Sequence, residues 1–339
     1  MGDGAPDRGG PGLVEELERH RAELTGYCYR MLGSGFEAED AVQEALVKAW
    51  RALDRYDPDR APLRSWLFHI ATNVCLDMLR GAQRRARAMD LGPAGSPGPD
   101  LGPPLTGQAW LLPIPDSRVL TADPAELAVE RETVRLAFVA ALQRLPPRQR
   151  AVLILRDVLR WSAAEVAELL EGSVASVNSA LQRARATLSE VPARGGLSGV
   201  PARGGLSGVP ARGGEVDRRL LERYVDAFER YDVSGLVALL HEDATMSMPP
   251  FAWWLRGRED IRKAMLAADA PCGGSRLVPA GTANGSPAFG QYLGGEPFAL
   301  LVVEVSGERV RATTTYLDTR LFPLFGLPMS FAGPPRTGE

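Results

Sequence analysis

Cysteine and histidine are scarce in this chain, whose 339 residues contain three of each. The cysteines stand far apart, at Cys28, Cys75 and Cys272. An odd and scattered set of this kind predicts neither a disulfide framework nor a zinc site, and the three histidines have no ligand spacing either. We therefore expect no bound metal and no cofactor.

Long apolar runs and an excess of charge are also missing. No stretch approaches the roughly 20 apolar residues of a membrane span, and the N-terminal MGDGAPDRGGPG has no apolar signal region. These absences predict a cytoplasmic protein without a membrane partner. Lys+Arg 39 against Asp+Glu 42 gives a formal net charge of −3. This balance argues against a protein that binds DNA through its overall charge alone. It is compatible with a protein that recognises a short DNA sequence while a partner protein makes most of the contacts to phosphate groups.

What the chain does have is a helix-turn-helix pattern over residues 145–188. Ser162 and Glu165 form a predicted capping box, Gly172 suits the turn, and Ser173 can cap the last helix. An apolar stripe predicts the buried side of that helix: Val177, Leu181, Ala184 and Leu188. The short polar and basic face opposite it is typical of a major-groove reader. The alternative is a plain helical bundle with solvated arginines.

A second polar stripe occurs on a predicted helix over residues 62–85, which Pro62 begins. Steps of 4, 4, 3 and 4 residues bring five side chains within about 80° of the helix circumference: His69, Asn73, Asp77, Arg80 and Arg84. Asparagine can contact a base edge and arginine can hold phosphate, so this face fits nucleic acid. The loop at 56–60 lies beside aromatic residues and suits an unstacked base. An ordinary charged helix face is the alternative.

The preceding segment predicts a helix over residues 37–51, with Ser34 as its cap. Its core side consists of Val42, Leu46 and Ala49, and another face carries Asp40, Gln43 and Glu44. An acidic face is unsuited to DNA and suits a basic protein partner. Simple solubility is the alternative explanation.

Composition divides the chain into six parts. The unit VPARGGLSG at 191–199 recurs at 200–208 and begins again at 209, which predicts a flexible linker. After residue 215, one helix is predicted over 215–240 and another over 257–268. A run of short, hairpin-linked strand patterns follows, the last at 309–322, which is typical of an α+β domain. The predicted parts are a disordered N-terminus (1–12), a helical domain (13–86), a Pro/Gly-rich linker (87–125), a second helical domain (126–190), the repeat linker (191–214) and the α+β domain (215–335).

The order of these patterns resembles an extracytoplasmic-function (ECF) sigma factor of bacterial RNA polymerase. DAVQEALVKAW at 40–50 is similar to the polymerase-binding helix of sigma region 2, and LRSWLFHIATNVCLDMLR at 63–80 to the helix that melts and reads the −10 element. The helix-turn-helix is similar to region 4, which reads the −35 element. The resemblance covers roughly half of the chain. It implies a transcription initiation factor, not an enzyme, whose partners are core RNA polymerase and promoter DNA.

The resemblance also implies roles for particular residues. Asp40, Gln43 and Glu44 would face the largest polymerase subunit, and the stripe from His69 to Arg84 would lie towards the −10 DNA. Five residues would enter the −35 major groove: Ser176, Asn178, Ser179, Gln182 and Arg183. The serines at 176 and 179 depart from the basic residues that the family usually has early in this helix. The 87–125 linker would thread towards the polymerase cleft. Its WLLPIPD segment resembles a motif of sigma factors that carry an extra C-terminal domain.

Residues 215–335 resemble SnoaL-like domains of the nuclear-transport-factor-2 superfamily. These are cones in which a curved sheet wraps around helices and encloses a pocket that can take a small molecule. Some are enzymes, and His241 with Asp243 is the candidate acid–base pair, because catalysis in a cone needs such groups to converge inside it. Trp253 and Trp254 are expected to fill the pocket or core, with Met246 and Met248, or to pack on the sigma domains.

We therefore expect two all-α sigma domains, a region 2 bundle and a region 4 helix-turn-helix, followed by an α+β cone. The expected function is a sigma factor regulated by its own C-terminal domain. Two alternatives stay open. One is a ligand-sensing helix-turn-helix regulator that binds promoters without polymerase. The other is a polyketide-cyclase-like enzyme fused to a DNA-binding module.

Overall fold

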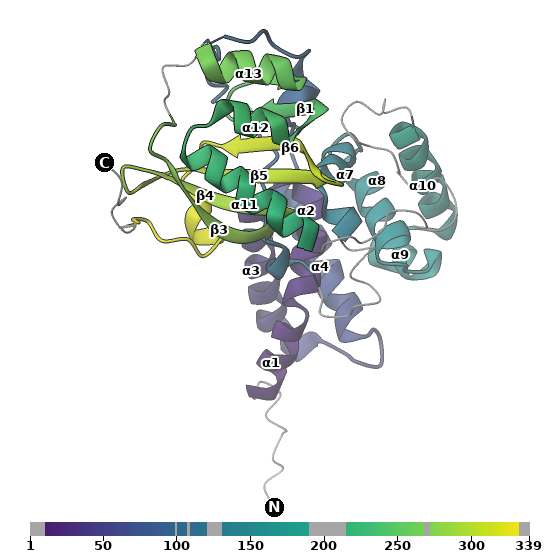
Figure 1. The fold of residues 1–339 in the computed structure, drawn as a ribbon. Coiled ribbons are helices and arrows are strands. Elements are labelled where there is room, and N and C mark those ends of the chain that lie inside the picture. Colours follow the sequence, from purple (N-terminus) through teal and green to yellow (C-terminus); the bar gives the residue numbers. More distant parts are fainter. Residues whose placement is uncertain are drawn as a thin grey trace, which may run out of the picture. The chain divides into compact units, whose positions relative to one another are not determined.

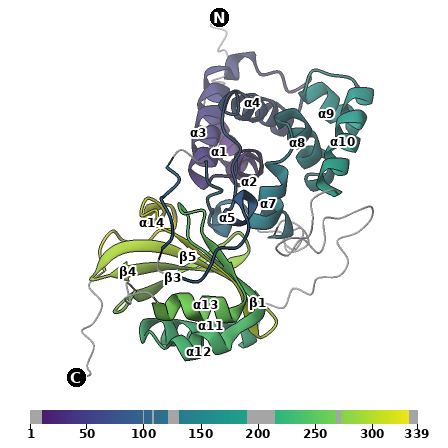
Figure 2. The ribbon, with the colours of Figure 1, turned by 90° about the horizontal axis from the view of Figure 1, so that it is seen from above.

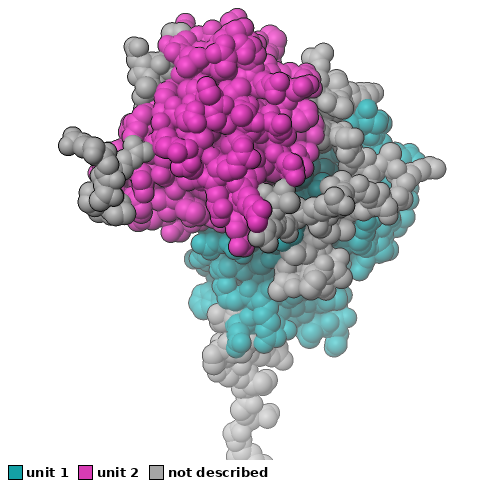
Figure 3. Space-filling view, in the orientation of Figure 1, with its two compact units in different colours: residues 1–85, 111–206 teal, residues 86–110, 207–339 magenta. Residues whose placement is uncertain are grey.

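The computed structural model describes residues 11–98, 100–106, 109–120, 131–189, 215–267 and 272–331. It divides into two compact units, the first formed by residues 1–85 with 111–206 and the second by residues 86–110 with 207–339 (Figure 3). Most of the predicted disordered N-terminus and the whole repeat linker at 191–214 lie outside the described residues. Within the described ranges, no helix has the length and apolar character that crossing a membrane requires.

Four helices begin the first unit (Figure 1). They are α1 (Pro11–Arg19), α2 (Arg21–Leu32), α3 (Gly35–Arg51) and α4 (Leu63–Met78), with a short 3-10 turn, η1 (Leu53–Arg55), after α3. Ser34 caps α3 as expected, since its side chain accepts a hydrogen bond from the Glu37 backbone N–H at 3.4 Å. Tyr27 and Phe68 are fully buried, with ring centroids 5.2 Å apart, and they join α2 to α4 in the core.

The predicted helix over residues 62–85 is too long. Helix α4 ends at Met78, and Gly81 has a φ of 73°, a left-handed conformation that a right-handed helix cannot contain. Arg80 and Arg84 therefore lie beyond the helix, so only His69, Asn73 and Asp77 remain on it. The prediction of one continuous five-residue stripe is wrong at its C-terminal end.

The rest of the first unit contains the helix-turn-helix. Its elements are the 3-10 turn η2 (Asp116–Arg118), α7 (Leu136–Leu142), α8 (Pro147–Leu153), the π-helical turn η3 (Ile154–Val158), α9 (Ala163–Leu169) and α10 (Val174–Ser189). The capping box is confirmed, because Ser162 and Glu165 bond reciprocally at 3.2 and 2.6 Å. Ser173 caps α10 by accepting from the Ser176 N–H at 3.1 Å. The predicted apolar stripe of α10 is buried along its whole length.

The second unit is built on one six-stranded sheet with strand order β2-β1-β6-β5-β4-β3; Figure 1 labels all of these strands except β2. Strands β3 to β6 are antiparallel neighbours, and β1 runs parallel to β6. The strands are β1 (Leu240–Ser247), β2 (Trp254–Arg256), β3 (Arg276–Ala283), β4 (Ser286–Leu293), β5 (Glu296–Ser306) and β6 (Arg309–Tyr316). The helices are α5 (Ala88–Leu91), α11 (Glu215–Glu229), α12 (Val233–Leu239), α13 (Arg258–Ala267) and α14 (Leu321–Leu324). The expected α+β arrangement is confirmed.

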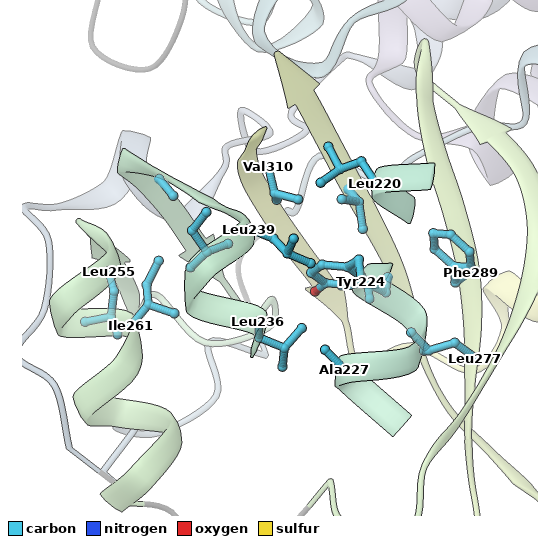
Figure 4. Packing of buried hydrophobic residues seen from close by; sticks show 14 of the residues in the cluster. Leu220, Tyr224, Ala227, Leu236, Leu239, Leu255, Ile261, Leu277, Phe289 and Val310 are labelled. Carbon is cyan, nitrogen blue, oxygen red and sulfur yellow. The ribbon is translucent and has the colours of Figure 1, made fainter. Parts of the chain in front are cut away.

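Helices α11, α12 and α13 lie on one face of this sheet and close a hydrophobic core with it (Figure 2). Tyr224 of α11 and Leu236 of α12 point into the cluster, opposite Phe289 of β4 and Val310 of β6 (Figure 4). Each fully buried aliphatic or aromatic side chain of this kind stabilises a fold by about 1.5–3 kcal/mol. The cluster therefore fixes the helices on the sheet.

Two expectations for this unit need correction. The single helix predicted over 215–240 is divided into α11 and α12, because Tyr231 has a φ of 53° and Asp232 starts a new helix by accepting from the Gly235 N–H at 2.9 Å. The last strand pattern, at 309–322, ends as a strand at Tyr316, and Leu321–Leu324 form the short helix α14. Local capping by an aspartate overrides the apolar periodicity in the first case.

Candidate nucleic-acid and protein interfaces

The exposed face of α10 has the form expected of a DNA-reading helix. Asn178, Ser179, Gln182 and Arg183 are exposed, as is Ser176. Within the described part of the chain, neither Gln182 nor Arg183 makes a side-chain hydrogen bond or ion pair. Arg185 differs, since it pairs with Asp157 at 2.6 Å and so holds α10 to η3. Side chains without intramolecular partners are available for base edges and phosphates.

Ser176 has a structural task on this helix. Its hydroxyl donates to the Ser173 carbonyl at 2.7 Å and accepts from the Ser173 N–H at 3.2 Å. The two serines thus cap the helix start reciprocally. The hydroxyl proton of Ser176 is already donated to the Ser173 carbonyl. Among the five residues predicted on α10, Ser176 is therefore the least available for a hydrogen bond to DNA.

His69 on α4 is engaged by the helix-turn-helix domain. Its Nδ1 lies 2.9 Å from the Leu169 carbonyl of α9, and its Nε2 lies 3.1 Å from Nδ2 of Asn73. A carbonyl only accepts and an amide nitrogen only donates, so Nδ1 carries the proton and Nε2 accepts. Asn73 and Asp77 are exposed beside it, and Asp77 pairs with Arg80 at 3.2 Å. His69 cannot reach nucleic acid while this contact exists.

A ring contact strengthens the same junction between the two helical parts of the first unit. Trp161, which precedes α9 and is buried, lies 5.2 Å from the Phe68 ring of α4, centroid to centroid. The Arg64 guanidinium lies 4.9 Å from the Trp161 ring, and its Nε donates to Glu23 at 3.0 Å. Such cation–π and aromatic contacts contribute about 0.5–2 kcal/mol each. They hold α4 against the start of α9.

Arg150 of α8 is a contact that the sequence patterns do not reveal. It is buried and donates to the Met31 carbonyl of α2, to Oε1 of Gln143 at 2.7 Å and to the Leu145 carbonyl at 3.1 Å. Burial lowers the pKa of its guanidinium to about 10, so it stays charged at neutral pH. From the sequence alone, an arginine just before an apolar helical segment is expected on the surface. The position of Arg150 in the apolar periodicity gives no indication that it is buried.

The acidic face of α3 is exposed as predicted. Asp40, Gln43 and Glu44 are all exposed, and Glu44 pairs with Lys48 at 2.7 Å with both side chains about half exposed (52% and 48%). Within the described residues, Asp40 makes no side-chain hydrogen bond or ion pair. Trp50 lies at the end of this helix with 59% of its surface exposed. Its spacing of seven residues from Gln43 puts it on the same face, a signal that sequence reasoning missed.

The second unit does not enclose the candidate acid–base pair. His241 and Asp243 are both exposed on β1; the Asp243 N–H donates to Nδ1 of His241 at 3.2 Å, and the Asp243 carboxylate pairs with Arg256 at 3.4 Å. The two groups therefore do not converge inside the sheet. Met246 and Trp253 pack against the core cluster, as expected. Trp254 instead donates its indole N–H to the Gly92 carbonyl at 3.1 Å.

Comparisons with known proteins agree with this division. Three family models match the chain: Sigma-70 region 2 over residues 17–85, Sigma-70 region 4 over residues 135–188 and a SnoaL-like domain over residues 221–315. The chain is 43% identical over 321 residues to the ECF RNA polymerase sigma factor SigG of Mycobacterium tuberculosis, covering 92% of this chain and 83% of the relative. It is 34% identical over 235 residues to SigJ of the same species, covering 69% and 64%.

A solved structure supports the same fold. The crystal structure of the Mycobacterium tuberculosis ECF sigma factor SigJ aligns with a TM-score of 0.55 and 23% identity, and covers 91% of this chain and 98% of that one. At this identity the likeness concerns the fold alone. It extends over the helical parts and the sheet domain together.

Proposed function

The chain belongs to the ECF sigma factors of RNA polymerase, and from this premise we propose that it reads both promoter elements while its SnoaL-like domain regulates initiation. Proteins of this family are transcription initiation factors rather than enzymes. The observation that carries the proposal is the presence of both sigma regions, in family order, in a chain that is 43% identical to SigG. The site of action is the cytoplasm, where the polymerase works.

The proposed roles follow the exposed faces. The acidic face of α3, formed by Asp40, Gln43 and Glu44, binds core polymerase. The region around α4 engages the −10 element through His69, Asn73, Asp77, Arg80 and Arg84. Helix α10 enters the −35 major groove with Ser176, Asn178, Ser179, Gln182 and Arg183.

Promoter binding requires regions 2 and 4 to separate. The names of the −10 and −35 elements place them about 25 base pairs apart, which is about 85 Å of B-DNA at about 3.4 Å per base pair. In this chain α4 contacts the segment around α9 through His69–Leu169 and Phe68–Trp161. The same surfaces cannot stay in contact and also lie on both elements. We propose that α4 and the segment around α9 are in contact in the free protein and that this contact breaks when the protein binds core polymerase.

Alanine at Gln182 is expected to relax base preference in the −35 element, because a lost bidentate base contact costs about 1–3 kcal/mol. Alanine at Arg183 is expected to weaken holoenzyme binding to all promoters alike if this arginine holds phosphate. Transcription from a set of single-base −35 variants measures both effects. Arg144→Ala is the matched control, since Arg144 is exposed in the same domain but lies off α10. Wild-type footprints and transcription from both α10 variants would show that this helix does not dock as proposed.

Promoter binding with and without core polymerase distinguishes this function from a ligand-sensing regulator. The sigma proposal expects a specific complex only when core polymerase is present, because the chain itself has a net charge of −3 and few phosphate contacts to offer. Tight, specific binding by the protein alone would favour the regulator instead.

A further inference from the structure

Arg160 has an unusual backbone conformation for an arginine. Its φ is 61°, in the left-handed region that favours glycine. The residue stands two positions after η3, and the following Trp161 N–H donates to the Leu155 carbonyl at 3.0 Å, which closes the end of that helical segment. A residue in this position of a helix end is usually glycine, because a Cβ is crowded there by the backbone. The fold therefore requires the left-handed turn, but it does not require an arginine in it.

The side chain of Arg160 is exposed, and other arginines hold the surrounding structure together. The Arg64 guanidinium lies over the Trp161 ring and pairs with Glu23. The Arg156 guanidinium donates to the Trp161 carbonyl. Arg160, by contrast, makes no side-chain hydrogen bond, ion pair or cation–π contact within the part of the chain that the structure describes. A strained backbone position that carries a free cation points to a use outside the chain.

The turn that contains Arg160 is fixed to the helix that we assign to the −35 groove. Asp157 of η3, three residues before Arg160, pairs with Arg185 of α10 at 2.6 Å. Two residues after Arg160, Ser162 caps the start of α9. When a helix-turn-helix binds DNA, its second helix lies in the major groove and its first helix crosses the sugar–phosphate backbone. With α10 in the groove, the start of α9, and Arg160 with it, lies beside a flanking phosphate strand.

The capping box at the start of α9 is already satisfied within the chain. The Ser162 hydroxyl oxygen accepts from the Glu165 N–H at 3.2 Å, and the Glu165 carboxylate accepts from the Ser162 N–H at 2.6 Å. Hydrogen bonds with the side chain and the backbone of Ser162 lower the pKa of Glu165, so its carboxylate is charged at neutral pH and repels a phosphate. A phosphate beside this helix start therefore needs a cation from a side chain, and Arg160 provides one.

We propose that Arg160 is a positioning residue that binds a backbone phosphate beside the −35 element and so fixes the orientation of α10 in the groove. The inference rests on the proposed sigma function and adds a contact outside the exposed face of α10. A guanidinium on a phosphate carries no base information, so it contributes equally to every −35 sequence. It displaces about one counterion from the DNA, which the salt dependence of binding measures.

The experiment titrates a labelled promoter with full-length holoenzyme at several salt concentrations. Arg160→Gln is expected to weaken binding about fivefold on all −35 variants alike, and to make the slope of log affinity against log salt shallower by about 0.9. Arg160→Lys retains the charge and is expected to retain the slope. Arg144→Gln is the matched control, because Arg144 is exposed in the same domain but lies off α10, and it is expected to match wild type.

Arg160→Gly separates DNA binding from folding. Glycine relieves the left-handed strain, so the midpoint of thermal unfolding is expected to rise by about 2 °C, while promoter binding weakens as in Arg160→Gln. Glu171→Gly is the control for this variant. Glu171 is exposed in the same motif and has a φ of 51°, so its replacement is expected to raise the midpoint without weakening binding.

Promoters with a single neutral methylphosphonate at successive positions beside the −35 element locate the contact. One position is expected to weaken wild-type binding and to have no further effect on Arg160→Gln. An unchanged salt slope in Arg160→Gln, the absence of such a position, or a loss confined to one −35 base would overturn the role of Arg160 while the wild type still binds. A wild type that forms no promoter complex with core polymerase would instead overturn the sigma function, and this inference with it.

Discussion

Reversing the charge at Asp40 and Glu44 together, by substitution with lysine, is expected to weaken binding to core polymerase about a hundredfold. Both side chains are exposed on α3, and Asp40 has no intramolecular partner among the described residues. Like charges placed against a basic partner surface cost several kcal/mol, and a hundredfold loss corresponds to about 2.7 kcal/mol. A binding titration at physiological salt measures the loss, and higher salt should reduce the difference through screening.

Asp54→Lys is the control for this result. Asp54 is exposed in the same domain but lies in η1, off the acidic face of α3. The substitution therefore makes the same aspartate-to-lysine charge reversal outside the proposed interface. We expect it to bind like wild type. An unchanged affinity of the Asp40/Glu44 variant, with an unchanged circular dichroism spectrum, would remove α3 from the polymerase interface.

Removing residues 215–339 is expected to change transcription strongly when the protein is limiting, because the domain that we propose to regulate initiation is then absent. Removing one nine-residue VPARGGLSG unit is expected to change it little. The composition of the repeat predicts a flexible linker. Such a linker would span about 27 Å with about 24 residues and about 21 Å with about 15 residues. The effective concentration of the domain therefore changes only about twofold. Run-off transcription with the three chains side by side measures both effects.

A truncated chain that matches full length at every promoter and salt concentration would show that the SnoaL-like domain is not a regulator. The enzyme-fusion alternative would then gain weight. A repeat deletion as severe as the truncation would contradict the tether argument, because it would give the repeat itself a specific role.

Local signals made much of this fold predictable. The Ser34 cap, the Ser162–Glu165 capping box and the buried stripe of α10 all depend on residues within a few positions of one another. Their geometry follows from helix periodicity and from unsatisfied N–H groups at helix starts. The end of α4 was missed because the charged sequence after Met78 keeps helical spacing, while the conformation of Gly81 stops the helix.

Contacts between distant segments were not predictable in this way. His69 meets Leu169, Arg150 meets Met31, and Gly95 meets Trp254, although each pair is far apart in sequence. No periodicity or cap encodes such pairs, because they depend on how whole helices and sheets pack. These contacts determine which candidate residues are accessible. The sequence therefore predicts the exposure of the proposed faces of α3 and α10 better than that of α4, where His69 contacts Leu169 of α9.

Run-off transcription with purified core polymerase on a linear promoter template tests the central proposal most directly. The account predicts a discrete transcript that requires the full-length protein and is lost when either the −10 or the −35 element is scrambled. The Asp40/Glu44 variant should reduce this transcript, and Arg144→Ala should not. No transcript from any promoter, together with specific DNA binding by the protein without polymerase, would contradict the account.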